Sequence, residues 1–150
     1  MNTVTTARLA GIAVTGIGLA RLVQEARHQR QRNETVVAGN RLDWLNAVST
    51  NRGLAELWAL EGMEVKKYMR LLHVNLHLCV LGLRDRLGMV SQENLRLYAS
   101  MLMKNDVFLR YWARFGSIRV QEAAGDRRSK KFTKVLVAVF KAHAPEKTST

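Results

Sequence analysis

The apolar stretch of residues 63–87 contains the side chains best suited to metal chemistry. His73 and His77 are four residues apart, the spacing at which a helix presents two imidazoles to one metal ion. The glutamate that follows the first histidine of the metalloprotease motif is absent. Arg70 and Arg84 share the same stripe and would repel a cation. We therefore expect a solvated polar edge here and no metal site.

Nucleophiles and paired carboxylates are equally scarce. Cys79 is the one cysteine of the chain, so a disulfide scaffold is excluded, and its apolar neighbours predict a small buried side chain. Glu61 and Glu64 form the only close carboxylate pair and suit the acidic first turn of a helix. Glycine-rich phosphate loops, nucleophile elbows and dinucleotide fingerprints are absent from the sequence. We expect neither enzymatic activity nor a cofactor.

The charge balance instead predicts an anionic partner. The 150 residues carry 24 Lys and Arg against 12 Asp and Glu, a formal net charge of +12. Eleven basic and four acidic side chains lie in residues 101–150, so this third holds most of the excess. Such a surface attracts nucleic acid or anionic lipid. The densest run supplies the candidate anion-binding residues Arg127, Arg128, Lys130, Lys131 and Lys134.

The same run opens an amphipathic helix. Phe132, Leu136 and Phe140 recur every four residues, and lysines occupy the opposite side. Two interpretations are open at this point. The helix lies on an anionic membrane or a phosphate backbone, or its apolar side packs on the protein's own core and the lysines are simply solvated.

The N-terminus contains an uncharged run, residues 9–20, between Arg8 and Arg21. As a helix this run rises about 18 Å, against about 30 Å of hydrocarbon in a bilayer. A window widened to residues 4–23 places the two arginines near opposite ends, where their long side chains can reach the headgroups. Three glycines make it a weak membrane span.

A basic stretch follows this run, and the positive-inside rule would place the domain after it in the cytoplasm. The competing interpretations are a secretory signal cleaved after Ala20, an organelle presequence or interfacial helix, and an ordinary bundle helix. The candidate membrane-contacting residues are Leu9, Ile12, Val14, Ile17, Leu19, Arg21, Arg27, Arg30 and Arg32.

From residue 40 onward, apolar residues recur with helical spacing, and no stretch shows the two-residue alternation of a strand. We predict an all-α fold, a small bundle of about five or six helices with a hydrophobic N-terminal helix. The first expected elements are a helix capped by Asn40 and ended by residues 49–53, a short amphipathic turn or helix at 54–58, and a long helix at 63–87. They are followed by a helix capped by Ser91, one capped by Asn105 or Asp106, a polar linker at 122–129, and a basic helix ending near His143.

Two further patterns concern binding. Residues 83–92 have the apolar positions and the glycine of a helix-turn-helix corner, but Arg84 occupies a position that needs a small residue, and the following helix is not strongly basic. Aromatic residues form either an interaction surface or core: Trp44, Trp58, Tyr111, Trp112 and Phe115.

A family resemblance rests on short landmarks in order along the chain: Arg41-Leu42-Asp43-Trp44-Leu45, Leu54-Ala55-Glu56-Leu57-Trp58, Asn75-Leu76, Leu87-Gly88-Met89-Val90-Ser91 and Arg110-Tyr111-Trp112. Over residues 38–142 the sequence resembles a family of short actinobacterial helical proteins that is catalogued as a domain of unknown function. The resemblance implies a helical fold, an N-terminal hydrophobic segment and a membrane-proximal location. It implies no activity, cofactor or catalytic residue.

The sequence thus predicts three segments: a membrane-associating or amphipathic helix with a basic juxtamembrane stretch at 1–37, a helical bundle at 38–143 and a mobile tail at 144–150. We expect a non-enzymatic interaction protein at the cell membrane, with its bundle in the cytoplasm. The expected partner is a membrane or anionic lipid surface, and a protein partner stays open. Alternatives are a cytoplasmic, helix-turn-helix-like nucleic-acid-binding protein and a bundle that binds a small molecule.

Overall fold

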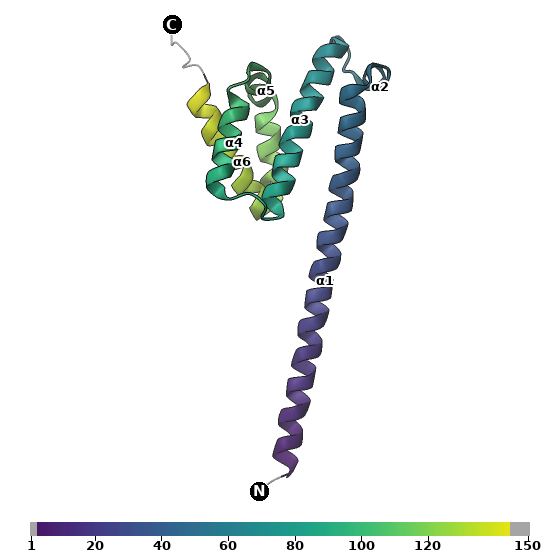
Figure 1. Ribbon diagram of the computed structural model, residues 1–150, viewed down its shortest axis with the longest axis vertical. Coiled ribbons are helices and arrows are strands. Elements are labelled where there is room, and N and C mark those ends of the chain that lie inside the picture. The colour runs from purple at the N-terminus through teal and green to yellow at the C-terminus, as the bar shows by residue number, and fades with distance from the viewer. Residues whose placement is uncertain (1–2, 145–150) are drawn as a thin grey trace. The chain divides into compact units, whose positions relative to one another are not determined.

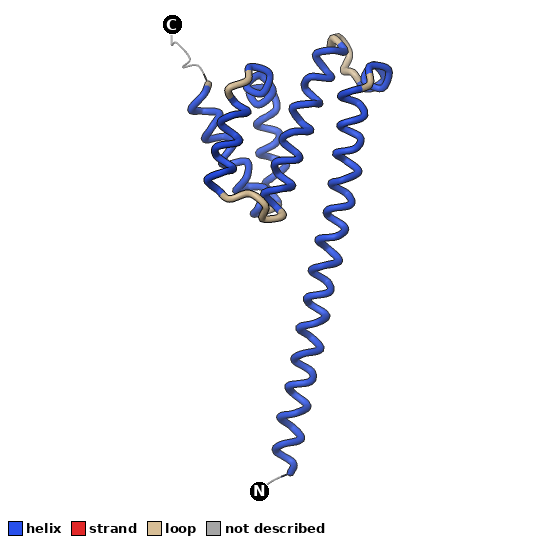
Figure 2. Tube along the Cα trace, viewed as in Figure 1, coloured by secondary structure: helices blue, strands red, loops and turns tan. Residues whose placement is uncertain are grey.

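The computed structural model describes the backbone of residues 3–144 and the side chains of residues 21–144. This part of the chain is all-α and contains no strand (Figure 2). The helices are α1 (Thr3–Thr50), α2 (Arg52–Trp58), α3 (Val65–Arg86), α4 (Gln92–Met103), α5 (Asp106–Glu122) and α6 (Arg127–His143), with a 3₁₀ turn, η1 (Ala123–Gly125), before the last. The predicted fold class and number of helices are confirmed. Of the tail predicted at residues 144–150, only residue 144 is among the described residues.

The chain divides into two compact units, Met1–Asn40 and Arg41–Thr150. The prediction that Asn40 caps a new helix is wrong, because α1 continues through this position to Thr50. Extending an existing helix past a glycine and an asparagine costs less than ending it and nucleating another. The helix ends only where Asn51 adopts an extended backbone and its side chain accepts a hydrogen bond from Leu54 N, at 3.1 Å.

The later helix starts follow from their capping residues. Ser91 and Asn105 cap α4 and α5 as expected, accepting hydrogen bonds from Asn94 N and Val107 N at 3.2 and 2.8 Å. The polar linker predicted at residues 122–129 is wrong in extent. Since Asp126 caps α6, accepting from Ser129 N at 3.0 Å, only η1 and Asp126 separate α5 from α6.

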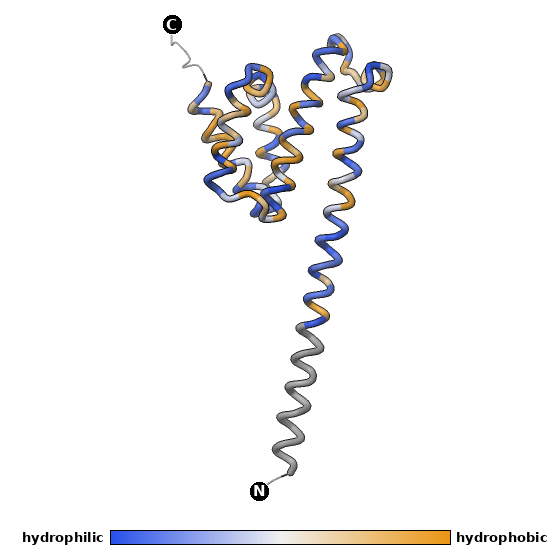
Figure 3. Tube along the Cα trace, viewed as in Figure 1, coloured by the Kyte–Doolittle hydropathy of each residue, from blue (hydrophilic) through white to orange (hydrophobic). Residues whose placement is uncertain are grey.

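The second unit packs around its own core, with α6 contacting α3, α4 and α5 (Figure 1). Apolar and polar residues alternate along these helices at helical spacing (Figure 3). The largest apolar cluster joins Val74 and Leu78 of α3 with Met103 of α4, Trp112 of α5 and Leu136 of α6. A second cluster joins the last turns of α1 to α2 and α3, through Leu45, Val48, Ala55 and Leu72.

At two glycines, any other residue would introduce backbone strain or a steric clash. Gly88 has φ = 72° in the turn between α3 and α4, a left-handed conformation that suits glycine. In α5, a Cβ on Gly116 would lie 2.8 Å from Nε1 of the buried Trp112. The absence of a side chain at Gly116 therefore lets the indole of Trp112 lie against its own helix.

Candidate anion-binding surface

The basic side chains of α6 line its solvent side. Arg127, Lys130, Lys131, Lys134 and Lys141 are all exposed, and we call this set the α6 basic stripe. Lys130 and Lys131 are adjacent and lie about 100° apart around the helix, and the other three side chains fall between them. Arg128 is exposed beside the stripe. The structure thus places all five sequence-predicted anion-binding residues on one helix and leaves them accessible.

The apolar side of α6 is occupied by the protein itself. Leu136 is 1% exposed in the main core cluster, and Phe132 and Phe140 pack against that cluster. Of the two interpretations of this amphipathic helix, insertion of its apolar side into a membrane is therefore wrong for the folded bundle. What remains for an external partner is the charge of the stripe alone.

Hydrogen bonds fix the start of α6 against the end of α3. Arg86 Nη2 donates to Ser129 Oγ at 2.8 Å and lies 3.2 Å from Asp126 Oδ2, while Arg128 Nη1 donates to Arg86 O at 3.1 Å. Hydrogen bonds from the Ser129 hydroxyl and backbone N–H are the main cause that lowers the pKa of Asp126. The lowered pKa favours the ionised form of Asp126, and the hydrogen bonds that it accepts as the N-cap of α6 stabilise its charge.

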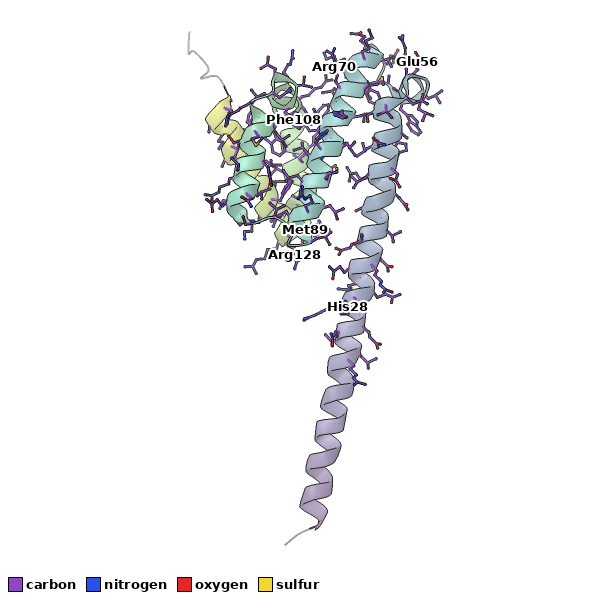
Figure 4. The ribbon with its side chains drawn as sticks, in the orientation of Figure 1. His28, Glu56, Arg70, Met89, Phe108 and Arg128 are labelled. Atoms are coloured by element: carbon purple, nitrogen blue, oxygen red, sulfur yellow. The ribbon has the colours of Figure 1, made fainter. Side chains whose placement is uncertain are left out.

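The described arginines of the N-terminal segment are exposed as well. Arg21, Arg27, Arg30 and Arg32 lie on α1 in a stretch, residues 21–37, whose side chains are all exposed. In Figure 3 the middle of this stretch is hydrophilic, with apolar residues near both of its ends, and Figure 4 shows His28 pointing out from α1. The apolar candidates Leu9, Ile12, Val14, Ile17 and Leu19 lie outside the residues whose side chains are described. Across the described residues, no helix is both long and apolar enough to cross a membrane.

The histidine pair of α3 makes contacts within its own helix and with α5. His77 Nδ1 lies 2.9 Å from His73 O, and the His77 ring meets Phe108 edge to face at 5.9 Å. Partial burial, and then the neighbouring His77, lower the pKa of His73. Within residues 21–144, no three His, Cys, Asp or Glu side chains gather closely enough to hold a metal ion.

A polar cluster between α3 and α5 escaped the sequence analysis. Arg119 donates a short hydrogen bond to Asn75 Oδ1 and lies 3.6 Å from Cys79 Sγ. Burial alone would lower the pKa of Arg119, but Tyr111 and Cys79 raise it, and their effect prevails. The available signal was the spacing of Asn75 and Cys79, which lie one turn apart and hence on the same side of α3.

The aromatic candidates separate into two groups. Tyr111 and Trp112 are buried, and Phe115 is partly buried against the core. Trp44 and Trp58 are exposed and meet edge to face, with ring centroids 5.8 Å apart. These two tryptophans therefore remain available for an interaction.

The helix-turn-helix corner is present only as a turn between packed helices. The helix that would read DNA, α4, exposes Leu97, Tyr98 and Met101 together with single charges at Glu93 and Arg96. A recognition helix needs polar and basic side chains to contact base edges and phosphates. The exposed side of α4 is therefore poorly suited to DNA.

Comparison with known proteins gives one relationship. No curated protein and no solved structure matches this sequence. The family of unknown function DUF6082 matches residues 2–149, almost the whole chain. The chain therefore belongs to this family of unknown function.

Proposed function

We propose that this protein is a non-enzymatic helical interaction protein that attaches to a membrane through its N-terminal segment. The observation that carries the proposal is that every side chain of residues 21–37 is exposed, including Arg21, Arg27, Arg30 and Arg32, which follow the uncharged run of residues 9–20. An apolar run followed by accessible arginines suits a bilayer, because the run enters the hydrocarbon and the arginines stay among anionic headgroups.

The charge asymmetry supports an orientation. Arg8 is the single charged side chain before the run, whereas four arginines follow it within residues 21–32. Cytoplasmic flanks carry the excess of Lys and Arg. The bundle therefore lies on the cytoplasmic side of the cell membrane in this proposal.

Fractionation tests the attachment. The full chain is expected to sediment with membranes and to stay there through a wash at about 1 M salt, where electrostatic attraction is screened within about 3 Å. A variant lacking residues 1–33 is expected in the soluble fraction. Recovery of the full chain entirely in the soluble fraction would overturn the proposal.

Protease access tests the orientation separately. The bundle is expected to resist protease added outside intact cells and to be cleaved once the membrane is permeabilised. Cleavage in intact cells would contradict a cytoplasmic bundle while leaving the attachment itself in place.

A further inference from the structure

The α6 basic stripe has no internal counterions. Helix α6 contains no acidic residue from Arg127 to His143. Asp126, directly before it, is engaged by Ser129, Arg128 and Arg86. Among the residues that the structure describes, no carboxylate pairs with a side chain of the stripe. The stripe therefore presents an unneutralised row of positive charge to solvent.

The helix that carries the stripe packs against the core of the bundle. The apolar side of α6 contacts two core clusters, through Leu136 in one and Val135 in the other. Thr133 is buried on the same side. Insertion of this apolar side into a partner would require α6 to separate from the core of the bundle. A partner of the folded bundle therefore contacts α6 through its exposed charged side chains.

We propose that the α6 basic stripe is a second membrane contact, which docks the bundle onto anionic phospholipid headgroups. This inference rests on the proposed function, because the N-terminal segment holds the bundle near the bilayer. Tethering converts the docking of the bundle into an intramolecular step, so a modest charge attraction is sufficient. Each lysine near an anionic surface improves binding by about fivefold.

The chemistry of the stripe favours headgroups over nucleic acid. Lysines occupy four of its five positions and act as point charges, whereas only Arg127 of the stripe and Arg128 beside it offer the planar fork that recognises phosphate or guanine in a bidentate manner. The other exposed residues of α6 are Arg128, Ala138 and Ala142, so the helix presents no exposed aromatic ring on which a base could stack.

The end of the bundle where the stripe begins also suits a lipid surface. Met89 is 64% exposed in the α3–α4 turn, three residues after Arg86, whose backbone O accepts a hydrogen bond from Arg128 at 3.1 Å; Figure 4 labels Met89 and Arg128. An exposed apolar side chain beside arginines is favourable where headgroups meet acyl chains. Against a phosphate backbone, the same methionine would gain nothing.

The test reports the position of the bundle while the whole chain stays attached. A dye is placed on the exposed Ala124→Cys position, just before α6 and outside the stripe, in the full chain carrying Cys79→Ser. Energy transfer from this dye to a headgroup-labelled lipid is then measured. Vesicles contain phosphatidylcholine alone or with about one third phosphatidylserine. Transfer is expected to be higher on the anionic vesicles and to fall between about 0.05 and 0.5 M salt, although the chain still floats with the vesicles.

Charge variants identify the stripe as the cause. In Lys131→Gln/Lys134→Gln/Lys141→Gln, the ratio of docked to undocked bundle is expected to fall about a hundredfold, about fivefold for each lysine. The matched control, Lys66→Gln/Lys67→Gln/Lys104→Gln, removes the same charge from exposed positions elsewhere on the bundle and is expected to change little.

Three outcomes would overturn the inference. If the chain floats but transfer is equal on neutral and anionic vesicles, or unaffected by the stripe variant, the docking is wrong and the N-terminal attachment stands. If mixed-sequence duplex DNA or RNA displaces the bundle at concentrations below that of the anionic lipid, the stripe binds nucleic acid. If the full chain floats with neither vesicle, the proposed attachment itself has failed.

Discussion

At the scale of single residues, Arg119 joins two helices through a polar, partly buried cluster. Its guanidinium crosses from α5 to α3, where Asn75 Oδ1 accepts its hydrogen bond and Cys79 Sγ lies 3.6 Å away. Burial raises the pKa of the neighbouring Tyr111, and Arg119 opposes that rise without reversing it. A partly buried charge with several partners stabilises a structure mainly through the cost of removing it.

Replacing Arg119 by alanine is therefore expected to lower the free energy of unfolding by about 1–3 kcal/mol, because Asn75 Oδ1 loses its partner in a partly buried site. Urea unfolding followed by circular dichroism measures this loss. Arg96→Ala, which removes an exposed arginine of α4, is the control and should stay within about 0.5 kcal/mol of the parent. Equal losses of unfolding free energy for the two substitutions would show that the Arg119 cluster does not stabilise the fold.

Asp126 gives a prediction that depends on pH. The Asp126→Ala substitution removes the α6 cap and is expected to cost about 1 kcal/mol at pH 7. Since the pKa of Asp126 is lowered in the folded protein from 3.8, the ionised cap stabilises the fold above that value, and its contribution is lost as pH falls through the lowered pKa. The difference between parent and variant should therefore narrow below about pH 4. Urea titrations at several pH values would contradict this if the difference stayed constant down to pH 3.

At the scale of the helices, local signals were sufficient for most of the fold. Ser91, Asn105 and the apolar periodicity of α3 predicted their elements, because capping and packing are local and agree there. The predicted start of a new helix at Asn40 was wrong, because α1 continues through this position even though asparagine is a good capping residue. The accessibility of the α6 basic stripe followed from its periodicity. Whether its apolar side met lipid or the core could not be predicted, because that depends on contacts with α3, α4 and α5.

The end of α1 is expected to be an integral part of the bundle core. Leu45 is 1% exposed there, whereas Leu57 of α2 is 77% exposed. Leu45→Ala should lower the free energy of unfolding by about 2–5 kcal/mol, because it removes buried methyl groups and leaves a cavity. Leu57→Ala deletes the same atoms from an exposed position and should cost less than about 0.5 kcal/mol. A small effect at Leu45 in chemical denaturation would contradict the packing of α1 against α2 and α3.

At the scale of the whole molecule, where the net charge is +12, two accessible sets of basic side chains matter for membrane binding. One follows the N-terminal apolar run and includes Arg21 and Arg32, and the other is the α6 basic stripe of the bundle. Apolar insertion resists salt, whereas surface charge is screened. A protein attached in both ways stays on the membrane at high salt through its N-terminal segment and loses the docking of its bundle.

Flotation of the full chain with vesicles at about 0.5 M salt, where surface charge is largely screened, tests the N-terminal attachment most directly. The variant Ile12→Ser/Val14→Ser/Ile17→Ser/Leu19→Ser removes apolar side chains from the N-terminal run. Its matched control, Leu57→Ser/Leu97→Ser/Met101→Ser/Ile118→Ser, removes as many exposed apolar side chains from parts of the bundle outside the proposed lipid contact. The parent and the control are expected to float with the vesicles, and the N-terminal variant is expected not to. Flotation of the N-terminal variant equal to that of the parent, or loss of flotation in the control alone, would contradict the N-terminal attachment.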